Sequence, residues 1–145
     1  MKRVICIILA IAALAVTFAA CGEQYRKLER IDLGGVKQVT IAVKADEDPA
    51  YTILKRKGIV EVVDLYNSAA FTETDKVKPE ELRAGTLYTF KLYGFEEEIL
   101  GECSISPDGY LLLPEEKDKV FLLKDGFDEE ALLETIKQFD VNAKV

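Results

Sequence analysis

The chain contains no histidine and no tryptophan, and it has only three cysteines and four prolines. The lack of histidine excludes a Ser-His-Asp triad, a histidine metal site and a histidine pH switch. Basic residues are in the minority as well: 19 Lys and Arg stand against 26 Asp and Glu, a formal net charge of −7. Because nucleic-acid phosphates require a basic surface, we expect no nucleic-acid partner.

The residues that are present suffice for one folded domain. The chain has 145 residues, of which 49% are hydrophobic and 31% charged. This composition provides a core for a single domain, and it excludes disordered, collagen-like, repeat and multi-pass membrane proteins.

The N-terminus has the organisation of an export signal. Met1, Lys2 and Arg3 form a basic start, and residues 4–18 (VICIILAIAALAVTF) form an apolar stretch. The basic residues stay on the cytoplasmic side of the membrane while the apolar stretch enters the bilayer as a helix. We therefore predict a signal peptide over residues 1–20.

The end of this leader resembles the lipobox of bacterial lipoproteins. Ala19 and Ala20 precede Cys21, Gly22 follows it, and Phe18 stands where leucine is usual. The resemblance implies that the sulfur of Cys21 receives a diacylglyceryl group and that Cys21 becomes the first residue of the mature protein. Two acyl chains anchor a protein stably, so the implied location is the extracytoplasmic face of the cell membrane.

Two other interpretations of the leader stay open, an uncleaved transmembrane anchor and an ordinary secretory signal. Residues 4–20 number only 17, which is the lower limit for crossing a hydrocarbon core of about 30 Å. No basic cluster follows at once, because residues 22–24 (GEQ) come before Arg26 and Lys27. These two features favour a lipid anchor over a transmembrane helix.

Cysteine usage agrees with export. Cys6 is lost with the leader and Cys21 is acylated, which leaves Cys103 as the only thiol and permits no intramolecular disulfide. Cys103 shares one face of a predicted strand with Gly101 and Ile105. Since no histidine can deprotonate it, we interpret Cys103 as a buried small hydrophobe rather than a nucleophile.

The chain after Cys21 divides into a tether and a domain. Residues 21–35 are polar and end in two glycines, so we expect a lipid-anchored tether with room for a short helix at Gln24–Arg30. Residues 36–145 are expected to form a single α+β domain. Period-two alternation predicts six strands in it, at residues 36–43, 50–54, 86–93, 98–106, 110–113 and 119–123.

Two amphipathic helices complete this fold. The first lies within Gly58–Asn67, and the second begins after Asp128, a good N-cap, and ends near Phe139. We treat Ser68–Gly85 as a long loop that has room for one helical turn from Pro79. The prediction is an antiparallel sheet, made of a two-strand hairpin and a four-strand meander, with both helices packed on one face.

A second resemblance concerns the domain. The order of elements resembles that of small extracytoplasmic domains of Gram-positive lipoproteins. It consists of a short strand at Tyr51–Leu54, a helix that ends in the sequence Leu65–Ser68, a meander and a closing helix. Those domains have no known function and no assigned catalytic residues. The resemblance therefore implies an uncharacterised lipoprotein domain and assigns no functional residues to this chain.

No pattern of residues points to catalysis, to a metal or to a cofactor. Asp46–Asp48 resembles a fragment of a calcium loop, but the glycine and the distal glutamate of such a loop are missing. Glu96–Glu98 and Glu115–Glu116 lie in predicted hairpin turns, where burial cannot raise a carboxyl pKa for acid catalysis. We therefore predict no catalytic residue, no metal ligand and no cofactor.

The function that fits best is a non-enzymatic binding or accessory module, tethered to the membrane and acting on a protein or an envelope component. The alternatives are a carboxylate-dependent hydrolase of envelope polymers and an enzyme-inhibitor domain. If the helices cover one face of the sheet, the other face and the 68–85 loop are left for a partner. The binding residues predicted there are Leu87, Lys91 and Tyr93, which alternate outward with Thr89 on one strand.

Overall fold

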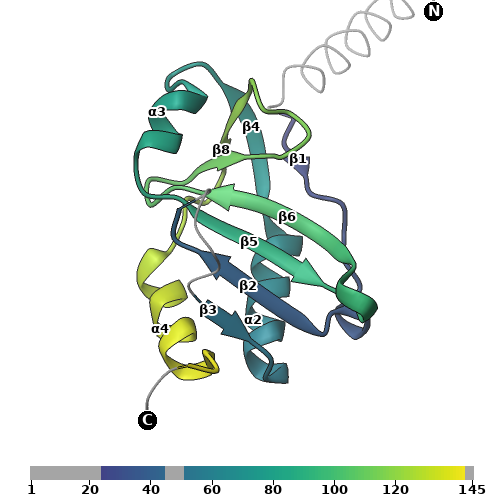
Figure 1. Ribbon diagram of the computed structural model, residues 1–145. Coiled ribbons are helices and arrows are strands. Elements are labelled where there is room, and N and C mark those ends of the chain that lie inside the picture. Colours follow the sequence, from purple (N-terminus) through teal and green to yellow (C-terminus); the bar gives the residue numbers. More distant parts are fainter. Residues whose placement is uncertain (1–23, 45–50, 143–145) are drawn as a thin grey trace, which may run out of the picture.

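The computed structural model describes residues 24–44 and 51–142 (Figure 1). The predicted signal peptide, Cys21 and the acidic run Asp46–Asp48 lie outside the described residues. In the described part, eight strands form one antiparallel sheet in the order β1-β4-β8-β7-β6-β5-β2-β3, accompanied by three α-helices. The predicted α+β class is confirmed.

Each of the six predicted strand segments contains a strand, and two further strands extend the sheet. The strands are β1 (Arg26–Lys27), β2 (Gln38–Ala42), β3 (Tyr51–Ile53), β4 (Ala70–Thr74), β5 (Tyr88–Tyr93), β6 (Ile99–Ile105), β7 (Tyr110–Leu112) and β8 (Val120–Leu123). The helices are α2 (Arg56–Ser68), α3 (Pro79–Ala84) and α4 (Glu129–Phe139), with two short 3-10 turns, η1 (Leu33–Gly35) and η2 (Phe95–Glu97).

The interpretation of residues 68–85 as a loop is wrong. The chain forms β4, which pairs with β8, and then α3, whose start at Pro79 confirms the helical turn that the sequence allows there. Phe71 fixes β4 in the sheet, because it is 1% exposed and its ring packs edge-on against the ring of Phe121, with 5.1 Å between the ring centroids. One buried aromatic and cross-strand pairing outweigh the polar character of the surrounding residues.

The prediction that the tether extends to residue 35 is also wrong, since the chain joins the domain at Arg26. No helix forms at 24–30; β1 pairs with β4 instead. Ile31 is buried, and the Asn67 side chain at the end of α2 holds its backbone through two hydrogen bonds of 2.9 Å. The many charged residues of this segment conceal its core contacts, because Leu28, Ile31 and Leu33 all pack in or against the main core.

The main core joins α2, α4 and alternate residues of the strands. Helix α2 contributes Ile59, Val62, Val63 and Tyr66, and α4 contributes Leu132, Ile136 and Phe139. The two helices touch each other closely at Gly58, where a Cβ atom would lie 2.7 Å from Ile53 and 2.8 Å from Phe139. The predicted cap of α4 is confirmed, because the Asp128 carboxylate accepts a hydrogen bond from the Ala131 N–H at 2.9 Å.

The residues that alternate with the core strand residues define a second surface, which we call the polar face. It carries Thr40, Thr52, Thr89, Lys91, Tyr93, Glu102 and Ser104, the neighbours of the core residues Val39, Ile41, Ile53, Phe90, Leu92 and Cys103. At one end of the sheet a smaller apolar cluster forms among Leu87, Leu112 and Val120, with Leu82 of α3 packed against it. Helix α3 therefore covers this end of the sheet.

Candidate functional site

The three residues predicted to bind a partner have different surroundings. Leu87 is 1% exposed and packs with Leu112 and Val120, so the prediction that it faces solvent is wrong. The physical reason is α3, whose Leu82 closes this end of the sheet. Lys91 and Tyr93 of β5 are half-buried and lie on the polar face.

A cavity of about 560 Å³ lies on the polar face where β2, β3 and β5 run side by side. We call it the β2–β3–β5 cavity. Its walls come from the three strands, the residue before β2 and the β5–β6 turn, and they comprise Lys37, Gln38, Thr40, Thr52, Leu54, Tyr93, Gly94 and Glu97. The volume lies within the range of small-molecule sites in proteins.

Strand pairing positions the side chains of this cavity. Thr40 of β2 is in register with Thr52 of β3 on one side and with Lys91 of β5 on the other. Gln38 pairs with Tyr93, two residues further along the same face. One row of polar side chains therefore crosses three strands and a second row crosses two, and four of these residues line the cavity: Gln38, Thr40, Thr52 and Tyr93.

The hydroxyl groups of the cavity have unused hydrogen-bonding capacity. Thr40 is 5% exposed, yet neither its hydroxyl nor those of Thr52 and Tyr93 bond to another residue in the described part of the chain. Elsewhere on the same face the hydroxyls of Thr89 and Ser104 bond each other at 2.8 Å. No buried side-chain polar atom of the described residues lacks a hydrogen-bond partner, so these hydroxyls are accessible to water or to a ligand in the cavity.

The backbone around the cavity is already paired. β2 lies between β3 and β5, and β5 lies between β2 and β6. On the outer side of β3, the Thr52 carbonyl accepts from the Val141 N–H and the Thr52 N–H donates to the Asp140 carboxylate, both at 2.9 Å. A ligand in this cavity meets side chains and finds no strand edge to extend.

The β5–β6 turn forms the rim of the cavity. Lys37 lies over the ring of Phe95, with 4.5 Å between its Nζ atom and the ring centroid, and Phe95 is 70% exposed. Glu96 and Glu97 have φ values of 53° and 61°. This left-handed conformation costs about 1–2 kcal/mol for a residue with a side chain, and it brings Glu97 to the rim.

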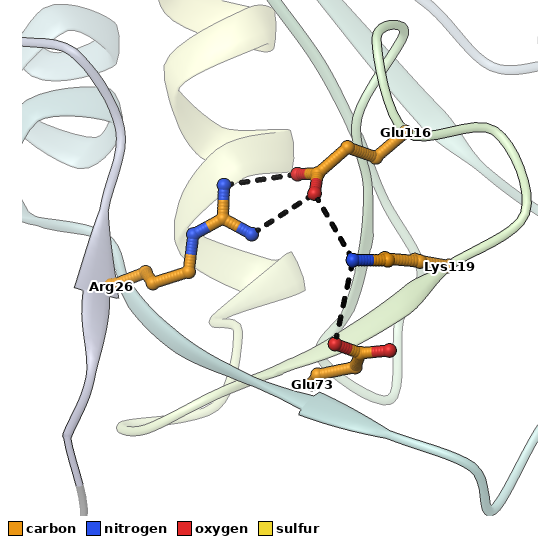
Figure 2. Close-up of polar contacts among 4 residues, drawn as sticks. All are labelled: Arg26, Glu73, Glu116 and Lys119. Carbon is orange, nitrogen blue, oxygen red and sulfur yellow. Dashed lines mark hydrogen bonds and ion pairs between the residues drawn. The ribbon is translucent and has the colours of Figure 1, made fainter.

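A second polar cluster ties the N-terminal strand to the sheet. Figure 2 shows the Arg26 guanidinium facing Glu116, with contacts of 2.9 and 3.3 Å, and Lys119 bridging Glu116 and Glu73 at 3.5 and 3.8 Å. The hydrogen bonds from Arg26 lower the pKa of Glu116. The Arg26 guanidinium also lies 5.1 Å from the centroid of the Phe121 ring. This cluster fastens β1, and so has a structural role.

Cys103 is 2% exposed, and burial raises the pKa of its thiol to about 12. Its predicted place in the core is confirmed. Among the residues that the structure describes, no group of three or more His, Cys, Asp or Glu side chains is placed to hold a metal ion. No helix in the same residues has the length and hydrophobicity needed to cross a membrane.

Sequence reasoning missed Thr40 and Thr52, the hydroxyls at the centre of the cavity. The signal that reveals them is the hairpin register: once Val39 is aligned with Ile53, Thr40 must lie beside Thr52 on the opposite face. Comparisons with known proteins add no further residues. No protein-family model, no curated protein and no solved structure matches the chain.

Proposed function

We propose that this protein is a lipid-anchored binding module on the extracytoplasmic side of the cell membrane, and that it binds its partner without catalysis. The observation that carries the proposal is the leader, in which a basic start and an apolar stretch end at Ala19-Ala20-Cys21. Acylation of Cys21 would hold the domain at the membrane. The polar face then provides the surface for a protein or an envelope component.

The short distance between the anchor and the fold supports this proposal. Four residues lie between Cys21 and Arg26, and the five residue steps of an extended chain span at most about 18 Å. Arg26 is held by Glu116, so the domain begins almost at once after the proposed anchor. A domain on so short a connection would act close to the membrane surface.

The proposal includes an arrangement of the sheet that exposes the polar face. In it, β2 and β3 form a hairpin, β5 to β8 form a meander, and α2 and α4 lie together on the opposite face. The strand order and the core shared by both helices support this arrangement. Tyr93 and Lys91 would then be contact residues, since an aromatic ring and a long cation are frequent anchors at interfaces.

Metabolic labelling with palmitate tests the anchor. We expect the wild-type chain to incorporate label and to partition into the detergent phase, and Cys21→Ala to lose both properties. Cys103→Ala is the matched control, because it removes the other cysteine outside the leader and should label normally. Label that persists in Cys21→Ala, or a wild-type chain without label, would contradict the proposal.

A further inference from the structure

We propose that the β2–β3–β5 cavity binds an uncharged carbohydrate chain of the cell envelope. This inference rests on the proposed binding function and names the ligand class of the same surface. The cavity has the dimensions of a small-molecule site, with a volume of about 560 Å³, and it is built on three adjacent strands. Rigid elements of this kind hold side chains in fixed positions.

The first argument is the kind of polar group in the cavity. Thr40, Thr52 and Tyr93 each present a hydroxyl, which both donates and accepts a hydrogen bond, and Gln38 adds an amide with the same two capacities. These hydroxyls bond to no other described residue, and because no buried side-chain polar atom of those residues lacks a partner, they are accessible to a ligand. Sugar hydroxyls are donors and acceptors too, so they can satisfy all of these groups.

The second argument is the apolar part of the wall. Leu54, which is 52% exposed, and the Tyr93 ring line the cavity beside the hydroxyls. A pyranose ring has C–H faces that pack against aromatic and aliphatic side chains while its edges form hydrogen bonds. The mixture of one ring, one leucine and several hydroxyls suits a sugar better than it suits a purely apolar ligand.

The third argument is charge. The rim carries Lys37 and Glu97, which have opposite signs, and the whole chain has a net charge of −7. A polyanionic ligand would be repelled by this charge, whereas an uncharged ligand would not. Among envelope polymers, the cavity therefore favours uncharged glycan.

The fourth argument distinguishes a sugar from a peptide. An extended peptide binds a sheet mainly through its backbone, by adding a strand to a free edge. Here β2 and β5 are interior strands, and Asp140 and Val141 occupy the outer side of Thr52. The cavity offers side chains only, which is how proteins read sugars.

Titration of the full chain by NMR tests the proposal, in micelles of a phosphocholine detergent that has no sugar headgroup. The probes are N-acetylchitotetraose and maltotetraose as uncharged sugars, and tetra-alanine as the peptide. We expect at least one sugar to shift the amide signals of Thr40, Thr52 and Tyr93 in a saturable way at concentrations up to about 10 mM. Tetra-alanine should leave those signals unchanged.

Matched variants locate the binding. Thr40→Val removes a hydroxyl at constant shape and should weaken sugar binding about tenfold, as expected for one lost hydrogen bond. Thr89→Val makes the same change outside the cavity and should alter affinity by less than about twofold. Circular dichroism reports whether Thr40→Val is folded. If it is not, Thr52→Val is used in its place, with the same expected loss of affinity.

Three outcomes would overturn the inference: no shift with either sugar, equal weakening by Thr40→Val and Thr89→Val, or saturable binding of tetra-alanine in the cavity. Palmitate labelling of Cys21 is independent of all three. If labelling succeeds and sugar binding fails, only the ligand class is wrong. If sugar binding succeeds and labelling fails, only the anchor is wrong.

Discussion

The two faces of the sheet use neighbouring residues of the same strands in opposite ways. On the core face, Phe90, Leu92 and Cys103 are at most 2% exposed and packed among apolar side chains. On the polar face, Thr40 is almost as well buried, but its hydroxyl has no partner in the described part of the chain. A low exposed fraction therefore does not by itself assign a residue to the core, since no buried side-chain polar atom of the described residues lacks a partner and the Thr40 hydroxyl is accessible to a ligand.

The largest effect is expected on the core face. Phe90→Ala should lower the free energy of unfolding by about 3–5 kcal/mol, since it removes a large buried ring and leaves a cavity. Urea unfolding of this variant measures the loss. Lys91→Ala, one residue further along β5, is the control and should change stability by less than about 0.5 kcal/mol. Equal losses in the two variants would remove the distinction between the faces.

A smaller effect concerns Cys103 and alkaline pH. Cys103→Ala should lower the free energy of unfolding by about 1 kcal/mol near neutral pH, because the cavity it leaves is small. Burial raises the thiol pKa from 9.0 to about 12 in the folded protein, so this group stabilises the fold below pH 9 and loses that contribution as pH rises toward 12.

The pH dependence of the free energy of unfolding tests whether Cys103 loses its stabilising contribution as the pH rises. Wild-type stability should fall as pH rises above 9, and Cys103→Ala should remove the part of the fall that begins near pH 9. The remaining fall belongs to Tyr66 and Tyr88, since burial raises the pKa of each to about 12. A native thiol that reacts with a thiol reagent as fast as the denatured one would contradict the burial of Cys103.

Much of the fold follows from local patterns in the sequence. Alternation places β2, β5 and β6, and Asp128 marks the start of α4. The missed strands β1 and β4 depend on distant partners, since Arg26 of β1 bonds Glu116 and Phe71 of β4 packs against Phe121. Periodicity cannot reveal such contacts, because their partners are far away in the chain.

The candidate site was predictable only in part, for the same reason. Alternation on β5 identifies Lys91 and Tyr93 as neighbours on one face. It also places Leu87 there, and it cannot show that Leu82 of α3 buries this residue. Thr40 and Thr52 enter the site through strand register, which a single strand does not reveal. To predict a binding surface that is built across several strands therefore requires the pairing of the strands as well as the alternation of residues within each strand.

The central claim is that the polar face binds while the core face stabilises, and the double variant Lys91→Glu/Tyr93→Ala tests it most directly. The measurement compares its melting temperature with its retention on pelleted bacterial cell-envelope material. We expect the melting temperature to change by less than about 2 °C and retention to fall at least about fivefold relative to wild type. Undiminished retention by the folded double variant would contradict the account.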